Sequence, residues 1–361
     1  MRILLLIDNL GSGGAQKQIV TLARLLKESN HSVEFLTYNE GDFFADSVKK
    51  ENIFINKTVT SSYLSRIIQV RNFIRKKKYD AVISFMDTPN FLNCISAIGG
   101  KSWKVITSER SNNCLAFNSF KGKIFRMTQR FSDIIVCNSE NSRKMWEKNS
   151  PRHLNKLITI YNPVILPVIT ASYIPKLNGK FNIVVAASYS SVKNPDGLIS
   201  ALRMLSPEEK MKINIEWYGR KEITRGNTSV YDNALKQIKK YNLEGIIQLK
   251  GETKDIANIM FKADAVGLFS RFEGLPNAVC EAMMMGKPIL MTKVSDFNTL
   301  VDESNGFLCD CDDTESIKNI LISSSNLTIE KLISLGKKSE IKAQKLFSPS
   351  NLVVRWNTVL K

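Results

Sequence analysis

Residues 271–288 read RFEGLPNAVCEAMMMGKP and place two glutamates, Glu273 and Glu281, eight positions apart. The apolar run AVGLFS directly before this stretch predicts a buried strand, and the segment after Pro276 predicts a helix, because proline suits a first helical turn. Leu275, near the expected N-cap, has no side-chain acceptor, so the first N–H groups of this helix are expected to be uncapped. Such a helix start suits an external anion such as a phosphate.

The two carboxylates predict recognition of hydroxyl groups. Glu281 is expected five residues into the helix, about 7.5 Å along its axis, which is too far for close contact with a phosphate at the helix start. In dinucleotide-binding folds an acidic residue accepts hydrogen bonds from ribose hydroxyls, and Glu281 suits that role. Glu273 is expected across from it, in the loop. The alternative is a helix with a proline start and surface acids, because short patterns often match by chance.

Length and composition indicate two globular domains. The chain has 361 residues, whereas a single core rarely grows beyond about 250–300 residues. Apolar residues make up 43% and charged residues 24%, which is ordinary for a globular protein. No apolar run approaches the ~20 residues that span a bilayer, and we interpret the N-terminal RILLLID as a first strand of a cytosolic protein. The six cysteines lack framework spacing and only two histidines are present, so we expect reduced thiols and no zinc site.

Strands and helices are expected to alternate along the whole chain, which predicts parallel, doubly wound sheets of the α/β class. Residues 161–180 contain three prolines and no clear period, so we interpret them as a linker between two domains. In the first half, strands are expected at 2–8, 31–38, 79–85, 104–109 and 133–140, and helices at 18–29, 63–78 and 119–131. In the second half, strands are expected at 181–188, 212–219, 246–251, 265–270, 287–292 and 306–310, and helices at 195–205, 230–241, 254–262 and after Pro276.

Several motifs together resemble glycosyltransferase family 4, whose members are retaining enzymes. The stretch that ends at Pro288 fits the family pattern F-S-x-x-E-G-L-P-N-x-x-x-E-A-M-x-x-G-x-P. Further similar segments are GSGGAQKQIVTLARLL (11–26), YNPV (161–164), KN (193–194), GETKDIANIMFKADAVGLFS (251–270) and NGFL (305–308). The resemblance implies the GT-B fold, with two Rossmann-like doubly wound domains facing each other across a cleft. It implies an acceptor-side domain at 1–163, to which a helix at about 347–361 crosses back, and a nucleotide-sugar-binding domain at 164–346.

The resemblance also implies roles for individual residues. Glu281 would hold the ribose of the donor, Glu273 would contact the hydroxyls of its sugar, and Lys193 would neutralise the departing diphosphate. The other residues implied at the nucleotide-sugar are Gly274, Leu275, Pro276, Asn277, Ala278, Ser188 and Gly219. The residues implied in the acceptor and phosphate loops of the first domain are Gly13, Gly14, Glu109 and Arg110. A plain tight turn is the alternative interpretation of the two glycines.

The chain departs from the family pattern in its phosphate-binding residues. Ser188 stands where many members have an arginine, so one cation is missing. Arg271 and Arg220 are the candidates to replace it. Gln16 stands where a glutamate often follows the two glycines.

Two further segments also differ. A histidine is frequent near the reacting centre of the family, but the corresponding segment here reads TSERSNN (107–113). VSDFNTLV (294–301) replaces a frequent glycine pair with a downstream glutamate. These changes leave the expected fold in place and make the donor sugar and the local mechanism less defined.

The basic charge of the chain favours an anionic partner. The net charge is +17, of which +12 lies in residues 1–170. The segment FKGKIFRMTQRF (120–131) mixes aromatic and basic residues and is expected either to lie on an anionic membrane or to pack as a core-facing amphipathic helix. RKKK (75–78) is more typical of a solvated helix end. No standard nucleic-acid-binding motif is present, so no nucleic-acid partner is expected.

The resemblance therefore predicts a retaining glycosyltransferase that moves a hexose or N-acetylhexosamine from a UDP-linked donor. The expected acceptor is an undecaprenyl-linked or other glycan of O-antigen, capsule or lipopolysaccharide biosynthesis, reached at the inner face of the cytoplasmic membrane. No cofactor and no metal are expected, because no Asp-x-Asp cluster lies beside the phosphate site and Lys193 with the helix N–H groups supplies positive charge. A UDP-sugar epimerase and a non-catalytic partner subunit of the same fold are the alternatives.

Overall fold

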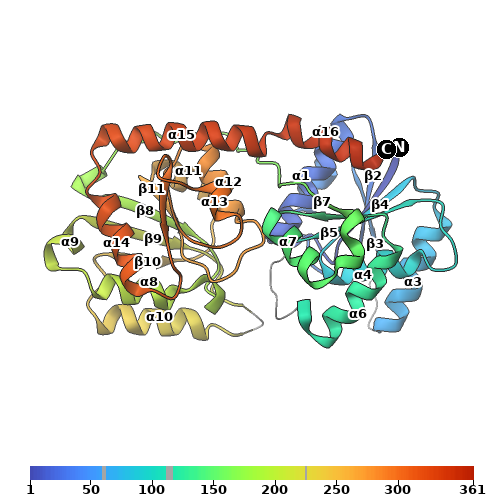
Figure 1. Cartoon of the computed structure of the whole chain (residues 1–361), viewed down its shortest axis with the longest axis horizontal. Helices are drawn as coiled ribbons and strands as arrows, with labels where there is room; N and C mark the ends of the chain where they lie inside the picture. The colour runs from blue at the N-terminus through green and yellow to red at the C-terminus, as the bar shows by residue number, and fades with distance from the viewer. Residues whose placement is uncertain (59–61, 111–116, 224–225) are drawn as a thin grey trace. The chain divides into compact units, whose positions relative to one another are not determined.

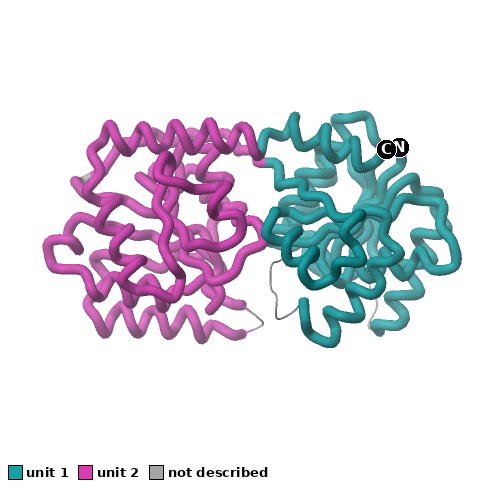
Figure 2. Tube along the Cα trace, in the orientation of Figure 1, with its two compact units in different colours: residues 1–163, 347–361 teal, residues 164–346 magenta. Residues whose placement is uncertain are grey.

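The chain divides into two compact units (Figure 2). Each unit is built around its own sheet. The structure is a computed structural model that describes residues 1–58, 62–110, 117–223 and 226–361. Unit 1 comprises Met1–Pro163 and Phe347–Lys361, and unit 2 comprises Val164–Leu346.

Unit 1 contains, among its described residues, a seven-stranded parallel sheet with the order β3-β2-β1-β4-β5-β6-β7 (Figure 1). Its strands are β1 (Arg2–Leu6), β2 (Ser32–Thr37), β3 (Phe54–Lys57), β4 (Ala81–Phe85), β5 (Lys104–Glu109), β6 (Ile134–Cys137) and β7 (Leu157–Thr159). Its helices are α1 (Gly14–Glu28), α2 (Ala45–Lys50), α3 (Tyr63–Lys76), α4 (Asp87–Ser96), α6 (Phe120–Thr128), α7 (Glu140–Asn149) and α16 (Pro349–Leu360). Because β1 lies between β2 and β4, the strand order reverses beside β1, and that is where doubly wound sheets bind ligands.

Unit 2 contains, in its described part, a six-stranded parallel sheet with the order β10-β9-β8-β11-β12-β13. Its strands are β8 (Phe181–Ala186), β9 (Ile213–Tyr218), β10 (Ile247–Lys250), β11 (Ala265–Leu268), β12 (Ile289–Thr292) and β13 (Gly306–Cys309). Its helices are α8 (Pro195–Arg203), α9 (Pro207–Met211), α10 (Ser229–Lys240), α11 (Ile256–Lys262), α12 (Asn277–Met284), α13 (Phe297–Leu300), α14 (Thr314–Ser325) and α15 (Ile329–Phe347). The strand order reverses between β8 and β11, so the loops after these two strands define the expected ligand position.

Helices cover both faces of the sheet in unit 2. Buried side chains of α8, α10 and α14 pack with those of β8 and β9 into one hydrophobic cluster that includes Leu198, Ile238, Leu321 and Trp217. Figure 1 shows α11, α12 and α15 on the opposite side of the same sheet. Continuous apolar strands such as β11, buried along its whole length, fit this arrangement because both of their faces lie in a core.

The linker segment before β8 is held onto unit 2 by polar contacts. The side-chain oxygen of Asn258 accepts the N–H groups of Thr170 and Ala171, at 2.9 and 3.2 Å. The fully buried carboxylate of Asp264 accepts the Tyr173 hydroxyl at 3.0 Å and the Lys176 N–H at 2.8 Å. The segment around residues 170–176 is therefore an ordered part of unit 2.

The prediction of two doubly wound α/β domains is confirmed, and several elements are additional. β3, β7, α2, α4, α7, α9, α13, α14 and α15 were not expected from the sequence. β3 and β7 are edge strands of four and three residues with partly exposed side chains, so neither has the continuous apolar run that marks a buried strand. The helix after Pro276 begins one residue later than expected, with Pro276 as its N-cap.

Candidate functional site

The loop after β8 presents Lys193 through a short turn. Residues Ser191–Lys193 form a 3-10 turn, and Asn194 follows with φ of 61°, the left-handed conformation that asparagine tolerates well. The fully buried Asn194 side chain accepts the Gly197 N–H at 3.2 Å, which caps α8, and donates to the Cys311 carbonyl at 2.9 Å. In the KN pair, Lys193 supplies the positive charge, and the hydrogen bonds of Asn194 hold the turn that carries it.

Lys193 forms an ion pair with Glu273 across the point where the strand order reverses. The Lys193 Nζ lies 2.6 Å from Glu273 Oε1, and the Ser270 hydroxyl donates to the same oxygen at 2.7 Å. The Lys193 and Glu273 side chains are 24% and 11% exposed, so solvent screens the pair only partly. Two residues eighty positions apart, predicted as the catalytic pair, are thus in direct contact.

The start of α12 follows this pair directly. No side chain caps the helix at Pro276, as the sequence predicts. Leu275 and Pro276 are buried, whereas Asn277 and Ala278 are partly exposed. The Gly274 carbonyl accepts a hydrogen bond from the Ser295 hydroxyl. The backbone just before α12 is thus held by a hydrogen bond from the segment after β12.

Glu281 lies in the second turn of α12 and is partly exposed. This places its carboxylate on the helix that begins beside Glu273, about one turn further along. The spacing of the two glutamates therefore separates them into a loop position and a helix position, as the sequence predicts.

Gly219 is required by the close approach of two loops. A Cβ atom at Gly219 would lie 1.9 Å from the Ala187 carbonyl oxygen and 3.0 Å from the Ser188 Cα. The end of β9 therefore packs directly on the segment that leads from β8 to Lys193. Ser188, the position at which the sequence resemblance implies a missing cation, is partly exposed in this segment.

The two arginines that could replace the missing cation differ in position. The Arg271 N–H donates to the Val192 carbonyl at 2.7 Å, and its guanidinium donates to the Ser191 carbonyl at 3.0 Å. Arg271 also pairs with Asp312 at 3.2 Å. Arg220 is exposed, and its carbonyl accepts the Tyr189 N–H at 3.0 Å. Arg271 is therefore attached to the turn that carries Lys193.

In unit 1, the glycine loop after β1 packs on Gln16. A Cβ atom at Gly13 would lie 2.1 Å from the Gln16 Oε1, and Gly14 is the first residue of α1. The Gln16 amide donates to Asp8 Oδ1 at 3.2 Å, and burial raises the pKa of Asp8 above its ordinary value. A glutamate at position 16 would oppose this carboxylate, which explains the glutamine here. Neither Asp8 nor this contact was expected from the sequence.

Glu109 is the last residue of β5 and Arg110 follows it, and their side chains are held by different partners. Glu109 is 6% exposed and accepts the Arg110 N–H at 2.9 Å and the Trp146 Nε1–H at 3.2 Å. The Arg110 guanidinium lies 3.5 Å from the centre of the Phe85 ring and donates to the side chain of Asn162, in the YNPV segment. The rest of the TSERSNN segment, from residue 111, lies outside the described residues.

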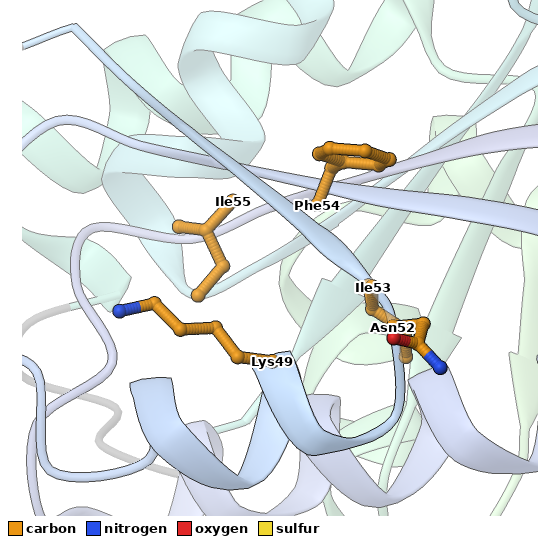
Figure 3. Close-up of a pocket in the computed structure, with 5 residues that line it drawn as sticks. All are labelled: Lys49, Asn52, Ile53, Phe54 and Ile55. Carbon is orange, nitrogen blue, oxygen red and sulfur yellow. The ribbon is translucent and has the colours of Figure 1, made fainter.

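A pocket, the metal-ligating side chains and the hydropathy of the helices also bear on possible partners. The pocket lies at the outer edge of the unit 1 sheet, between α2 and β3, and contains none of the predicted site residues (Figure 3). It is lined by Lys49, Asn52, Ile53, Phe54 and Ile55. The described part of the chain has no group of three His, Cys, Asp or Glu side chains placed to hold a metal ion. None of the described helices has the length and hydropathy needed to cross a bilayer.

Comparison with known proteins gives two adjoining family matches and similar structures. Residues 173–339 match the family described as Glycosyl transferases group 1, and residues 12–166 match Glycosyltransferase Family 4. The structure of Anabaena HepE in complex with UDP and glucose superposes with a TM-score of 0.86 at 19% identity, covering 100% of this chain and 99% of that chain. These findings define a glycosyltransferase with the GT-B fold, as predicted. The chain belongs to glycosyltransferase family 4.

Two curated relatives are similar over most of their length. One is a Campylobacter jejuni α-1,4-N-acetyl-D-galactosaminyltransferase whose name specifies a diNAcBac-PP-undecaprenol-linked acceptor; it is 25% identical, over 87% of this chain and 86% of its own. The other is the Escherichia coli UDP-Gal:α-D-GlcNAc-diphosphoundecaprenol α-1,3-galactosyltransferase, also 25% identical, over 87% of this chain and 82% of its own. Both are bacterial enzymes that extend lipid-linked sugars, according to their names.

The close approach at Gly219 generates a prediction. Gly219→Ala places a methyl group against the Ala187 carbonyl and forces the Lys193 loop to move, which should cost about 1–3 kcal/mol of unfolding free energy. Thermal and urea denaturation measure this cost, and titration calorimetry with UDP should show weaker binding. Gly245→Ala is the control, because a Cβ atom there has nothing within 4 Å. Equal stability of the two variants would contradict the close approach.

Proposed function

We propose that this chain transfers a hexose or N-acetylhexosamine from a UDP-linked donor to a lipid-linked or polysaccharide acceptor, with retention of configuration. The observation that carries the proposal is the Lys193–Glu273 ion pair, which lies beside the uncapped start of α12 where the strand order of unit 2 reverses. A nucleoside diphosphate needs positive charge and N–H donors where its negative charge develops. Support for the donor and acceptor classes comes from the names of the relatives, one of which specifies UDP-Gal and a diphosphoundecaprenol-linked sugar.

In this proposal each site residue has one role toward the donor. Lys193 and the N–H groups at the start of α12 stabilise the diphosphate, and Glu281 accepts hydrogen bonds from the ribose. Glu273 accepts hydrogen bonds from sugar hydroxyls. When the donor binds, its diphosphate replaces Glu273 as the partner of Lys193, which leaves the Glu273 carboxylate available to the sugar. The acceptor hydroxyl attacks the anomeric carbon on the face from which the diphosphate leaves. Its oxygen forms the new glycosidic bond, the bond between the sugar and the diphosphate breaks, and the departing diphosphate takes the hydroxyl proton. Lys193 and the N–H groups of α12 supply the stabilising charge without a metal.

The two glutamates should respond differently to substitution. Glu281→Gln removes a charged acceptor from the ribose and should weaken UDP binding by about 1–3 kcal/mol. Glu273→Gln should leave UDP binding intact or strengthen it, because Lys193 loses its competing partner, while transfer is abolished. Titration calorimetry with UDP and a transfer assay on membrane extract test both variants. Equal loss of UDP affinity in both would show that the glutamate roles are assigned wrongly.

We also propose reversible attachment of unit 1 to the inner face of the cytoplasmic membrane. No residue of α6, a helix that the structure describes throughout, is fully buried, and its apolar side chains other than Phe125 are exposed. Ring contacts link α3, α4 and α6. Tyr63 of α3 stacks on Phe91 of α4 with ring centroids 6.5 Å apart, and Phe91 stacks on Phe125 of α6 at 4.9 Å. The exposed apolar residues of α3 and α6, here named the α3–α6 surface, are Tyr63, Leu64, Ile68, Phe120, Ile124 and Met127.

The three basic residues of α6 divide into two groups. Arg126 donates to the Phe117 carbonyl and lies 4.1 Å from the centre of the Phe117 ring, so it stabilises the fold. Lys121 and Lys123 are exposed beside Phe120, which is itself 81% exposed. Exposed aromatic and basic side chains on one helix suit the interface of an anionic membrane. The two lysines are therefore the charges that we assign to membrane attachment.

Liposome sedimentation tests this attachment. Lys121→Gln with Lys123→Gln should reduce binding to phosphatidylglycerol vesicles at low salt, by about 1 kcal/mol for each lysine. Lys236→Gln with Lys239→Gln is the matched control, because it removes the same charge from the exposed face of α10 in unit 2. UDP affinity should be unchanged in both double variants. If the wild type does not sediment with these vesicles, or if both double variants lose binding equally, attachment through the α3–α6 surface is wrong.

A further inference from the structure

The loop between β11 and α12 is held at both ends by hydroxyl groups from a neighbouring segment. The fully buried Thr292 hydroxyl, at the end of β12, donates to the Ser270 carbonyl at 2.6 Å. The Ser295 hydroxyl donates to the Gly274 carbonyl. These contacts bracket Glu273, which lies between the two carbonyls in the sequence.

Ser295 adopts an unusual backbone conformation to make its contact. Its φ is 57°, in the left-handed region that residues other than glycine rarely occupy, and its side chain is buried with 7% exposure. Ser295 belongs to the segment VSDFNTLV, where the family frequently has a glycine pair. A glycine would adopt this φ at no steric cost but would supply no hydroxyl. The serine thus adds a hydrogen bond that a glycine cannot make.

The contact fixes the orientation of one peptide group at the start of α12. In a planar trans peptide the carbonyl and the following N–H point in opposite directions. Because the Gly274 carbonyl points toward the Ser295 hydroxyl, the Leu275 N–H of the same peptide group points away from Ser295. A fixed N–H dipole stabilises a negative charge more than a rotating one does, since no reorganisation is needed when the anion binds.

We propose that Ser295 is a positioning residue for the diphosphate of the donor, acting through the Gly274–Leu275 peptide. This inference rests on the proposed donor site and adds a residue to it that the family pattern does not include. Ser295 does not touch the ligand. It sets the direction of a backbone N–H group on which the phosphate binds, so its effect should appear in the part of the affinity that the diphosphate contributes.

The test compares UDP with uridine. Ser295→Ala removes the hydroxyl, and Ser295→Gly removes it while relieving the left-handed backbone. Both variants should weaken UDP binding about tenfold and change uridine binding less than twofold, because uridine lacks the phosphates. Titration calorimetry measures UDP, and competition against UDP measures uridine. Having two variants keeps the test decisive if one of them folds poorly.

A matched control separates positioning from general packing. Ser339→Ala removes a different buried hydroxyl of unit 2, which donates to the Asn305 carbonyl at 3.4 Å. This control should change neither affinity. If the Ser295 variants lose UDP and uridine affinity together, Ser295 supports the fold of the whole site and the proposal is wrong; if they lose neither, it is also wrong. Failure of the wild type to bind UDP would instead overturn the proposed donor site, and the role of Ser295 with it.

Discussion

The ion pair between Lys193 and Glu273 is the contact on which the organisation of the candidate site depends. The two residues follow β8 and β11, which are far apart in sequence and adjacent in the sheet of unit 2. Only a parallel, doubly wound sheet brings these two strand ends together at the point where the order reverses. In the proposed function this pair connects the fold to the chemistry, because it offers a cation to the diphosphate and a carboxylate to the sugar hydroxyls.

Backbone conformations that few residues tolerate bring the loops to this pair. Asn194, with a left-handed φ, turns the chain into α8 directly after Lys193. Gly219 allows the end of β9 to pack on the Ala187 carbonyl, beside the same loop. Ser295, also left-handed, holds the other loop at Gly274. The side chains proposed to meet the ligand are thus few, and the residues that place them are distributed over three loops, after β8, β9 and β12.

The class of fold could be predicted from the sequence because long apolar runs are local signals. The E-x7-E spacing likewise predicted one glutamate in a loop and one in the following helix, and their roles toward a ligand stay a prediction. It did not predict short edge strands such as β3, whose pairing depends on a neighbour and not on its own hydrophobicity. Long-range contacts were also inaccessible, since no local pattern reports that Trp146 donates to Glu109 or that Gln16 donates to Asp8. The departures from the family pattern at Gln16 and Ser295 gained a physical explanation only from their contacts with Asp8 and with the Gly274 carbonyl.

An experimental structure of this chain with bound UDP tests the central claim most directly. The account predicts that the Lys193 Nζ lies within about 3.2 Å of a diphosphate oxygen, with its contact to Glu273 exchanged or shared. It also predicts that Glu281 accepts hydrogen bonds from the ribose. A structure in which UDP binds elsewhere, while Lys193 keeps Glu273 as its only charged partner, would contradict the account.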